Sequence, residues 1–194
     1  MAVGITGVFG AGKTTVSALF AKHGYKVINA DEIGHILLNK KPIRDRIVKE
    51  FGSSVLTKNR IDRRKLKDIV FYDPKELIRL NRIIHPPLIK EIKSGIRKNK
   101  SGRVIVDGAL LVEAGCAGLF DRLIVVKAGR KELLKRLLKK GKYNKKEIEN
   151  ISRSQLSQRE KLKYADYIID NSKSLENTKK GVERVIKMIK GELR

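Results

Sequence analysis

The segment GVFGAGKT at residues 7–14 is a complete phosphate-binding pattern of the form G-x-x-x-x-G-K-[ST]. The apolar run at 2–6 before it suits a buried strand, and the apolar spacing from Val16 to Phe20 after it suits a helix. A glycine-rich turn between a strand and a helix points backbone N–H groups and the positive end of the helix dipole at one spot. The segment therefore predicts a nucleotide phosphate site rather than a turn that only joins two elements.

The chemistry expected of this loop is the binding of ATP together with Mg²⁺. The residues assigned to ATP are Gly10, Ala11, Gly12, Lys13, Thr14 and Thr15. Lys13 would reach the β- and γ-phosphates, and the Thr14 hydroxyl would ligate Mg²⁺.

Two aspartates follow apolar runs, and one of them could orient the hydroxyl that attacks the phosphate. Asp31 ends the run at 27–30, and Asp107 ends the run at 104–106. Ligands of parallel sheets bind beyond the carboxyl ends of the strands, so Asp31 is expected beside the loop. Its alternative role is the N-cap of a helix that starts at Glu32. Asp107 fits the loose Walker B pattern, which holds Mg²⁺ directly or through water, or it caps a turn.

Glu113 and His85 are candidates for the side of the site that binds the phosphate acceptor. Glu113 could join Asp107 near the acceptor or be an ordinary helix carboxylate. His85 precedes two prolines inside the helical pattern at 74–99, and prolines end or kink a helix. The histidine could therefore face the acceptor, with a structural role as the alternative.

A basic stretch at 130–163 could close over the phosphates as a lid. Arg136, Lys139 and Lys140 fall on about one face of a predicted helix, and Arg153 lies on the next one. Cations at this place would spread the charge that develops during phosphoryl transfer. The alternative is a lysine face that only meets solvent.

The elements that must position these residues alternate between short strands rich in Ile and Val and amphipathic helices. The predicted strands are 3–6, 26–29, 103–107, 122–127 and 167–170, and the predicted helices are about 13–23, 31–39, 41–51, 63–69, 74–99, 130–140, 145–163 and 175–191. This alternation predicts a three-layer α/β fold, a five-stranded parallel sheet with helices on both faces. We expect one P-loop domain over 1–194: a core of 1–30, 101–129 and 164–194, a helical acceptor-binding region at 31–100 and a helical lid at 130–163.

Composition narrows the class of protein. The 194 residues carry 45 Lys and Arg against 21 Asp and Glu, and this net charge of +24 either attracts polyanions or reflects surface lysines that favour solubility. Aromatic residues make up only 5%, and no DNA-binding motif occurs, so no specific nucleic-acid partner is expected.

Location is predicted from what the sequence lacks. Cys116 is alone, so an internal disulfide is excluded, and no apolar run reaches the length of about 18 residues needed to span a bilayer. The first predicted strand leaves no room for a signal peptide. We expect a cytoplasmic protein without a membrane partner, and the sequence does not indicate an oligomeric state.

Taken in their order and spacing, these motifs resemble the dephospho-CoA kinase family of P-loop kinases. The matching segments are TGVFGAGKTT at 6–15, NAD at 29–31, HP at 85–86, DGALLVE at 107–113, Gln155 and ADYIIDN at 165–171. The resemblance covers nearly the whole chain and implies that ATP phosphorylates the ribose 3′-hydroxyl of dephospho-CoA, the last step of coenzyme A synthesis. A nucleoside or nucleotide kinase on the same scaffold is the alternative, and a nucleic-acid-binding P-loop protein is a second one.

The resemblance also implies roles for single residues. Asp31 would act as the base or orient the hydroxyl, His85, Leu110 and Glu113 would line the acceptor site beside Asp107, and Asn171 would lie near the adenine of ATP.

The chain departs from the family pattern at two places. Gly108 and Ala109 stand where the family usually has Ile-Pro, and Lys140 stands where its lid helix commonly has an arginine. Either Lys140 or Arg136, one turn earlier, would therefore be the cation of the lid.

Overall fold

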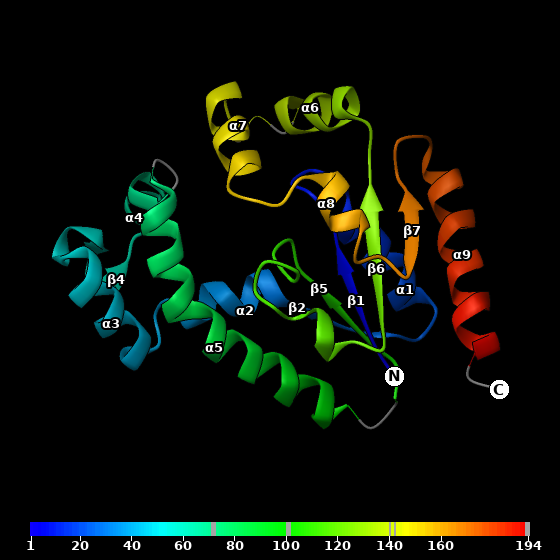
Figure 1. Ribbon diagram of the computed structural model, residues 1–194, viewed down its shortest axis with the longest axis horizontal. Coiled ribbons are helices and arrows are strands. Elements are labelled where there is room, and N and C mark those ends of the chain that lie inside the picture. The colour runs from blue at the N-terminus through cyan, green and yellow to red at the C-terminus, as the bar shows by residue number, and fades with distance from the viewer. Residues whose placement is uncertain (71–72, 100–101, 140, 142, 193–194) are drawn as a thin grey trace.

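The computed structural model describes residues 1–70, 73–99, 102–139, 141 and 143–192. Its centre is a five-stranded parallel sheet in the order β2-β5-β1-β6-β7 (Figure 1). The strands are β1 (Ala2–Thr6), β2 (Lys26–Asn29), β5 (Val104–Asp107), β6 (Arg122–Lys127) and β7 (Tyr167–Asp170). The predicted strands are thereby confirmed to within a residue, because short runs rich in Ile and Val suit the strands of a parallel sheet, of which β1 and β5 are buried along their whole length.

Helices follow most of the strands where the sequence predicts them. They are α1 (Lys13–Lys22), α2 (Ala30–Leu37), α3 (Lys41–Phe51), α4 (Arg63–Val70), α5 (Pro74–Lys98), α6 (Arg130–Lys139), α7 (Lys145–Arg153), α8 (Gln158–Leu162) and α9 (Leu175–Glu192). The single helix expected at 145–163 is wrong, because the chain forms α7 and α8 there. Ser157 starts α8 with a capping box, in which the side chains of Ser157 and Glu160 each accept the other residue's backbone N–H.

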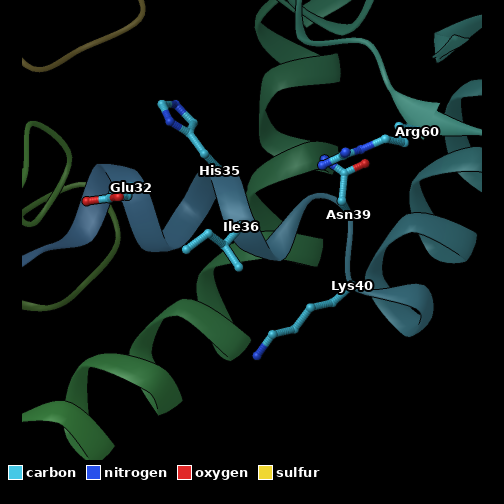
Figure 2. Close-up of a pocket in the computed structure, with 6 residues that line it drawn as sticks. All are labelled: Glu32, His35, Ile36, Asn39, Lys40 and Arg60. Carbon is cyan, nitrogen blue, oxygen red and sulfur yellow. The ribbon is translucent and has the colours of Figure 1, made fainter.

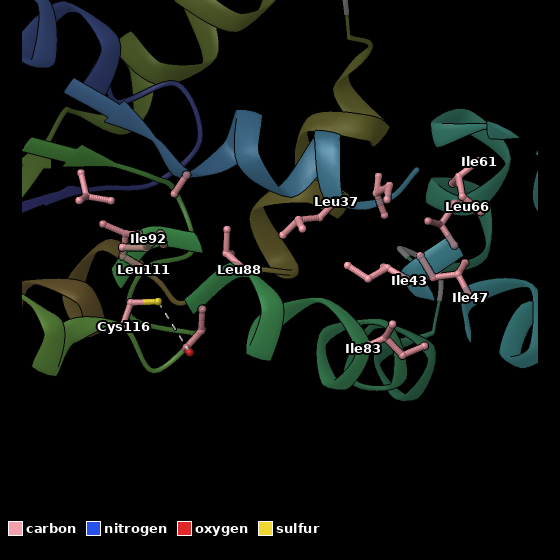
Figure 3. Packing of buried hydrophobic residues seen from close by; sticks show 14 of the residues in the cluster. Leu37, Ile43, Ile47, Ile61, Leu66, Ile83, Leu88, Ile92, Leu111 and Cys116 are labelled. Atoms are coloured by element: carbon pink, nitrogen blue, oxygen red, sulfur yellow. Dashed lines mark hydrogen bonds between the residues drawn. The ribbon is translucent and has the colours of Figure 1, made fainter. Parts of the chain in front are cut away.

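Apolar side chains of the strands alternate between two clusters, one on each face of the sheet. Val104 and Val106 belong to the cluster that includes α2, α3 and α5, whereas Ile105 belongs to the cluster that includes α1 and α9. The first cluster continues from Leu111 to Ile47 of α3, which joins the outlying helices to the core (Figure 3). Helices therefore cover both faces of the sheet, as predicted.

Helix α5 runs without a break through Pro86 and Pro87 and bends along its length (Figure 1). Each proline lacks the N–H group that would bond to the carbonyl four residues earlier. Of the two outcomes expected of these prolines, the kink is therefore the one that occurs.

A short antiparallel hairpin between α3 and α4 is missing from the sequence prediction. Its strands are β3 (Leu56–Thr57) and β4 (Arg60–Ile61), and its turn residues Lys58 and Asn59 have φ values of 49° and 59°. Strands of two residues are too short to produce an alternating pattern in the sequence.

Helices α6 and α7 lie over the carboxyl edge of the sheet, whereas α3 and α4 lie beyond α2 at its side (Figure 1). Among the described helices, none combines the length and the apolar composition that crossing a bilayer requires.

Candidate active site

The phosphate-binding loop joins β1 to α1, and glycines determine its shape. Gly12, the N-cap of α1, has a φ of +89°, and Gly10 has a φ of +85°, a region that other residues rarely adopt. A Cβ atom at Gly12 would clash with the side-chain amide of Asn171. The first N–H groups of α1 have no partners within the helix, so they and the helix dipole favour a phosphate at this place.

Two side-chain amides from distant parts of the chain hold this loop. Asn171 donates from Nδ2 to the Ala11 carbonyl at 2.8 Å, and its Oδ1 accepts the Thr178 hydroxyl at 2.8 Å. Gln155 accepts the Phe9 N–H at 3.1 Å. Asn171 is buried and bonded at both ends of its amide, so it supports the loop, and its expected place near the adenine stays a prediction.

Asn171→Ala is expected to destabilise the protein by about 1–3 kcal/mol, because the Ala11 carbonyl loses its side-chain donor and the buried Thr178 hydroxyl keeps only its 3.3 Å hydrogen bond to the Ser174 carbonyl. The KM for ATP is expected to rise as well, since the loop loses one of its supports. Urea unfolding and steady-state kinetics measure the two effects. Asn177→Ala, at an exposed position of α9, is the matched control, and an Asn171 variant as stable as this control would contradict the supporting role.

Lys13 is the cation of the loop. Its Nζ donates to the Gly7 carbonyl at 3.2 Å. Burial lowers the pKa of Lys13, while the negative charges of Asp31 and Asp107 oppose this shift. The charges of Asp31 and Asp107 therefore act on Lys13 at the carboxyl edge of the sheet.

Asp107 ends β5, the strand between β2 and β1, and is buried, with an exposed fraction of 6%. Its Oδ2 accepts the Ser17 hydroxyl at 2.9 Å. Burial raises the pKa of Asp107, and the Ser17 hydrogen bond and the Lys13 charge oppose this shift. Thr14 is exposed one turn before Ser17 on the same side of α1, so its hydroxyl and the Asp107 carboxylate offer the oxygen ligands that suit Mg²⁺.

Asp31 lies in the first turn of α2 but does not cap it. The N-cap is Asn29, whose Oδ1 accepts the Glu32 N–H at 3.0 Å, so the capping role considered for Asp31 is wrong. The Asp31 carboxylate instead accepts the Ala109 N–H, at 3.2 Å through Oδ1 and at 3.4 Å through Oδ2. Because Ala109 follows β5, the carboxylate turns toward the strand that separates β2 from β1.

Glu113 and His85 lie close enough to interact electrostatically. Burial lowers the pKa of His85, and the charge of Glu113 opposes this shift. Both carboxylate oxygens of Glu113 accept from Nζ of Lys161, at 2.6 and 2.7 Å, and one of them also accepts the Leu156 N–H at 2.9 Å. Leu110 is partly exposed on the turn before Glu113. Contacts of these residues with an acceptor stay predictions, and no pattern in the sequence singled out Lys161.

Arg136 brings a cation from α6, which lies in the predicted lid, to the loop. Its Nε donates to Oε1 of Glu132 at 3.0 Å, and its Nη1 lies 3.8 Å from the position that a Cβ atom would take at Gly12. The other candidate, Lys140, lies outside the described residues. Lys139 and Arg153 are exposed.

The segment from Tyr143 to α7 contacts both the loop and α4. The Tyr143 ring packs edge-on against Phe9 with 5.1 Å between centroids, and Nζ of Lys67 lies 5.3 Å from the centroid of the Tyr143 ring. Lys67 of α4 also pairs with Glu147 of α7 at 3.1 Å. The loop, α4 and α7 are therefore joined above the carboxyl edge of the sheet.

A surface pocket of about 420 Å³ opens along α2 (Figure 2). It is lined by Glu32, His35, Ile36, Asn39, Lys40 and Arg60. Burial and the charge of Arg63 lower the pKa of His35, and Asp31 and Glu32 oppose this shift. Arg63 therefore lies near His35, in the last turn of α2, at a place that the sequence analysis did not assign.

Known proteins resemble this chain over nearly its whole length. The profile of the dephospho-CoA kinase family matches residues 1–177. The dephospho-CoA kinase of Fusobacterium nucleatum is 40% identical over 191 residues, which cover 97% of this chain and 98% of that protein. The solved structure of TT1252 from Thermus thermophilus has a TM-score of 0.82 and 29% identity, covering 100% of this chain and 98% of its own. That of the Campylobacter jejuni dephospho-CoA kinase has a TM-score of 0.71 and 29% identity, covering 98% of both chains. The chain therefore belongs to the dephospho-CoA kinase family.

Proposed function

We propose that the protein transfers the γ-phosphoryl group of ATP to the ribose 3′-hydroxyl of dephospho-CoA, which yields coenzyme A and ADP. The observation that carries this proposal is the electrostatic grouping of Lys13, Asp31 and Asp107 at one edge of the sheet. The acceptor, dephospho-CoA, is inferred from the membership of the chain in the dephospho-CoA kinase family.

In this reaction the 3′-hydroxyl oxygen attacks the γ-phosphorus, and the bond to the oxygen that bridges the β- and γ-phosphates breaks. Asp31 orients the hydroxyl and takes its proton, which suits a carboxylate already held by the Ala109 N–H. Lys13 and Arg136 stabilise the charge on the transferring group and on the leaving ADP. Asn171 lies at the adenine end of the ATP site.

Mg²⁺ is the proposed divalent cofactor. The Thr14 hydroxyl would ligate it, and Asp107 would hold it directly or through water, because both offer the hard oxygen ligands that this ion prefers. When bound, Mg²⁺ neutralises charge on the β- and γ-phosphates.

The acceptor is proposed to occupy the side of the site formed by residues 31–100, with His85, Leu110 and Glu113 near its sugar. Residues 130–163 form the lid, and 1–30, 101–129 and 164–194 form the core. A cytoplasmic location is supported by the buried, unpaired Cys116, which suits a reducing compartment. No specific nucleic-acid partner and no membrane partner are proposed.

A coupled assay for ADP with ATP, Mg²⁺ and a panel of acceptors tests the proposed function. We expect ADP formation to depend on dephospho-CoA and mass spectrometry to detect coenzyme A as the product. ADP formation with nucleosides or nucleoside monophosphates, and none with dephospho-CoA, would reject the proposal in favour of a nucleoside or nucleotide kinase.

A further inference from the structure

Lys161 of α8 is a buried cation that the proposed reaction does not use. Its side chain has an exposed fraction of 0%, and Nζ lies 2.6 Å and 2.7 Å from the two carboxylate oxygens of Glu113. A buried charge is tolerated when it is paired and hydrogen-bonded. The third contact of Nζ is with the Ala109 carbonyl at 2.8 Å, and this contact connects Lys161 to the active site.

Hydrogen bonds hold the backbone of Ala109 at both its carbonyl and its N–H, which belong to two successive peptide groups. Its carbonyl accepts from Lys161 and, at 3.2 Å, from the Thr6 hydroxyl at the end of β1. Its N–H donates to the carboxylate of Asp31. We infer that Lys161 is a positioning residue, which fixes the Ala109 segment and thereby the carboxylate of Asp31 for the attacking hydroxyl. This inference rests on the proposed function.

The local structure explains why this segment needs a clamp. The turn after β5 begins with Gly108, which packs so closely that a Cβ atom there would lie 3.0 Å from the Cβ of Ala30. Gly108 allows the close approach to α2 but leaves its own backbone torsions free of side-chain restraint. Without Lys161, rotation about these torsions can turn the Ala109 N–H away from Asp31.

The position of Lys161 also connects the lid to Asp31. Helix α8 starts with the capping box at Ser157, directly after the lid helix α7, and Glu113 additionally accepts the Leu156 N–H at the same junction. The position of the Lys161 side chain therefore depends on how the segment between α7 and α8 packs against the turn after β5.

The test is a double-mutant cycle between Lys161→Met and Asp31→Asn, with kcat measured for dephospho-CoA as the acceptor. Lys161→Met alone is expected to lower kcat about tenfold, the lower end of the range for residues that orient a functional group. The KM for ATP should stay the same. In the Asp31→Asn background Lys161→Met should change kcat by less than about twofold, because residues that act through one group are not additive.

Two further variants separate positioning from folding. Lys161→Met leaves the partly buried carboxylate of Glu113 without its ion-pair partner, so Lys161→Met with Glu113→Gln removes both charges while Gln still accepts the Leu156 N–H. We expect this pair to unfold near the wild-type temperature and to have a lower kcat than Glu113→Gln alone, which is measured beside it because Glu113 is proposed to line the acceptor site. Lys127→Met is the control, because Lys127 pairs with Asp170 at 3.1 Å and has no contact with the Ala109 peptide among its described interactions.

The outcomes distinguish this inference from the proposed function. A wild-type enzyme that does not phosphorylate dephospho-CoA overturns the proposed function. A wild-type enzyme that does so, together with an unchanged kcat in the Lys161 variants or with fully additive losses in the cycle, overturns the positioning role alone.

Discussion

Asp31→Asn is expected to lower kcat for dephospho-CoA by about a hundredfold or more, the range for the loss of a positioned base. Asn has nearly the same shape, and its Oδ1 can still accept the Ala109 N–H, but its amide does not take the proton of the attacking hydroxyl. The affinity for ATP should be kept, because the carboxylate is bonded to the turn after β5 and not to the phosphate-binding loop.

Steady-state kinetics at saturating ATP and calorimetric titration with ATP measure the two quantities separately. Asp45→Asn, at an exposed carboxylate of α3, is the control for the loss of one negative charge from a chain of net charge +24. Turnover near the wild-type value in the Asp31 variant would exclude Asp31 as the base.

Lys13→Ala is expected to lower kcat/KM for ATP by about a thousandfold, the upper range for the loss of one group that stabilises a transition state. Both ATP binding and turnover should fall, since one ammonium group serves the ground state and the transition state. The variant should fold, because burial lowers the pKa of Lys13, which means that the site does not favour the charged form it holds.

Kinetics with ATP as the varied substrate and a melting curve check this result. Lys22→Ala is the matched control, because Lys22 is an exposed lysine in the last turn of the same helix α1. A Lys13 variant that kept its affinity for ATP, or that lost activity only through unfolding, would contradict the assigned role.

Positively and negatively charged side chains are grouped around the place where the triphosphate is proposed to bind. Burial is the main cause of the lowered pKa of Lys13, and the positive charge of Lys161 adds a smaller contribution in the same direction. Arg136 adds a third cation beside Gly12. The site therefore gathers positive charge where a triphosphate is proposed to bind, and it balances that charge with Asp31, Asp107 and Glu113.

Patterns of neighbouring residues in the sequence predict the phosphate-binding loop, the strands and the positions of two carboxylates. The eight residues at 7–14 predict the loop because its glycines, lysine and threonine are neighbours along the chain, and the strands were predicted because each is a short segment rich in Ile and Val. Asp31 and Asp107 could be placed at one edge, since the carboxyl ends of parallel strands meet there. Charge and length limited the class of protein but named no substrate.

Tertiary structure decided which side chains support the site. Asn171 reaches Ala11 across 160 positions of sequence, and Lys161 reaches Ala109 across 52. Such contacts depend on the order β2-β5-β1-β6-β7 and on where α8 begins, and no spacing along the chain encodes them. The sequence by itself determined the phosphate-binding loop and its cation, whereas the orientation of Asp31 by a clamped peptide exists only in the folded protein, because its partners come from four segments that the fold brings together.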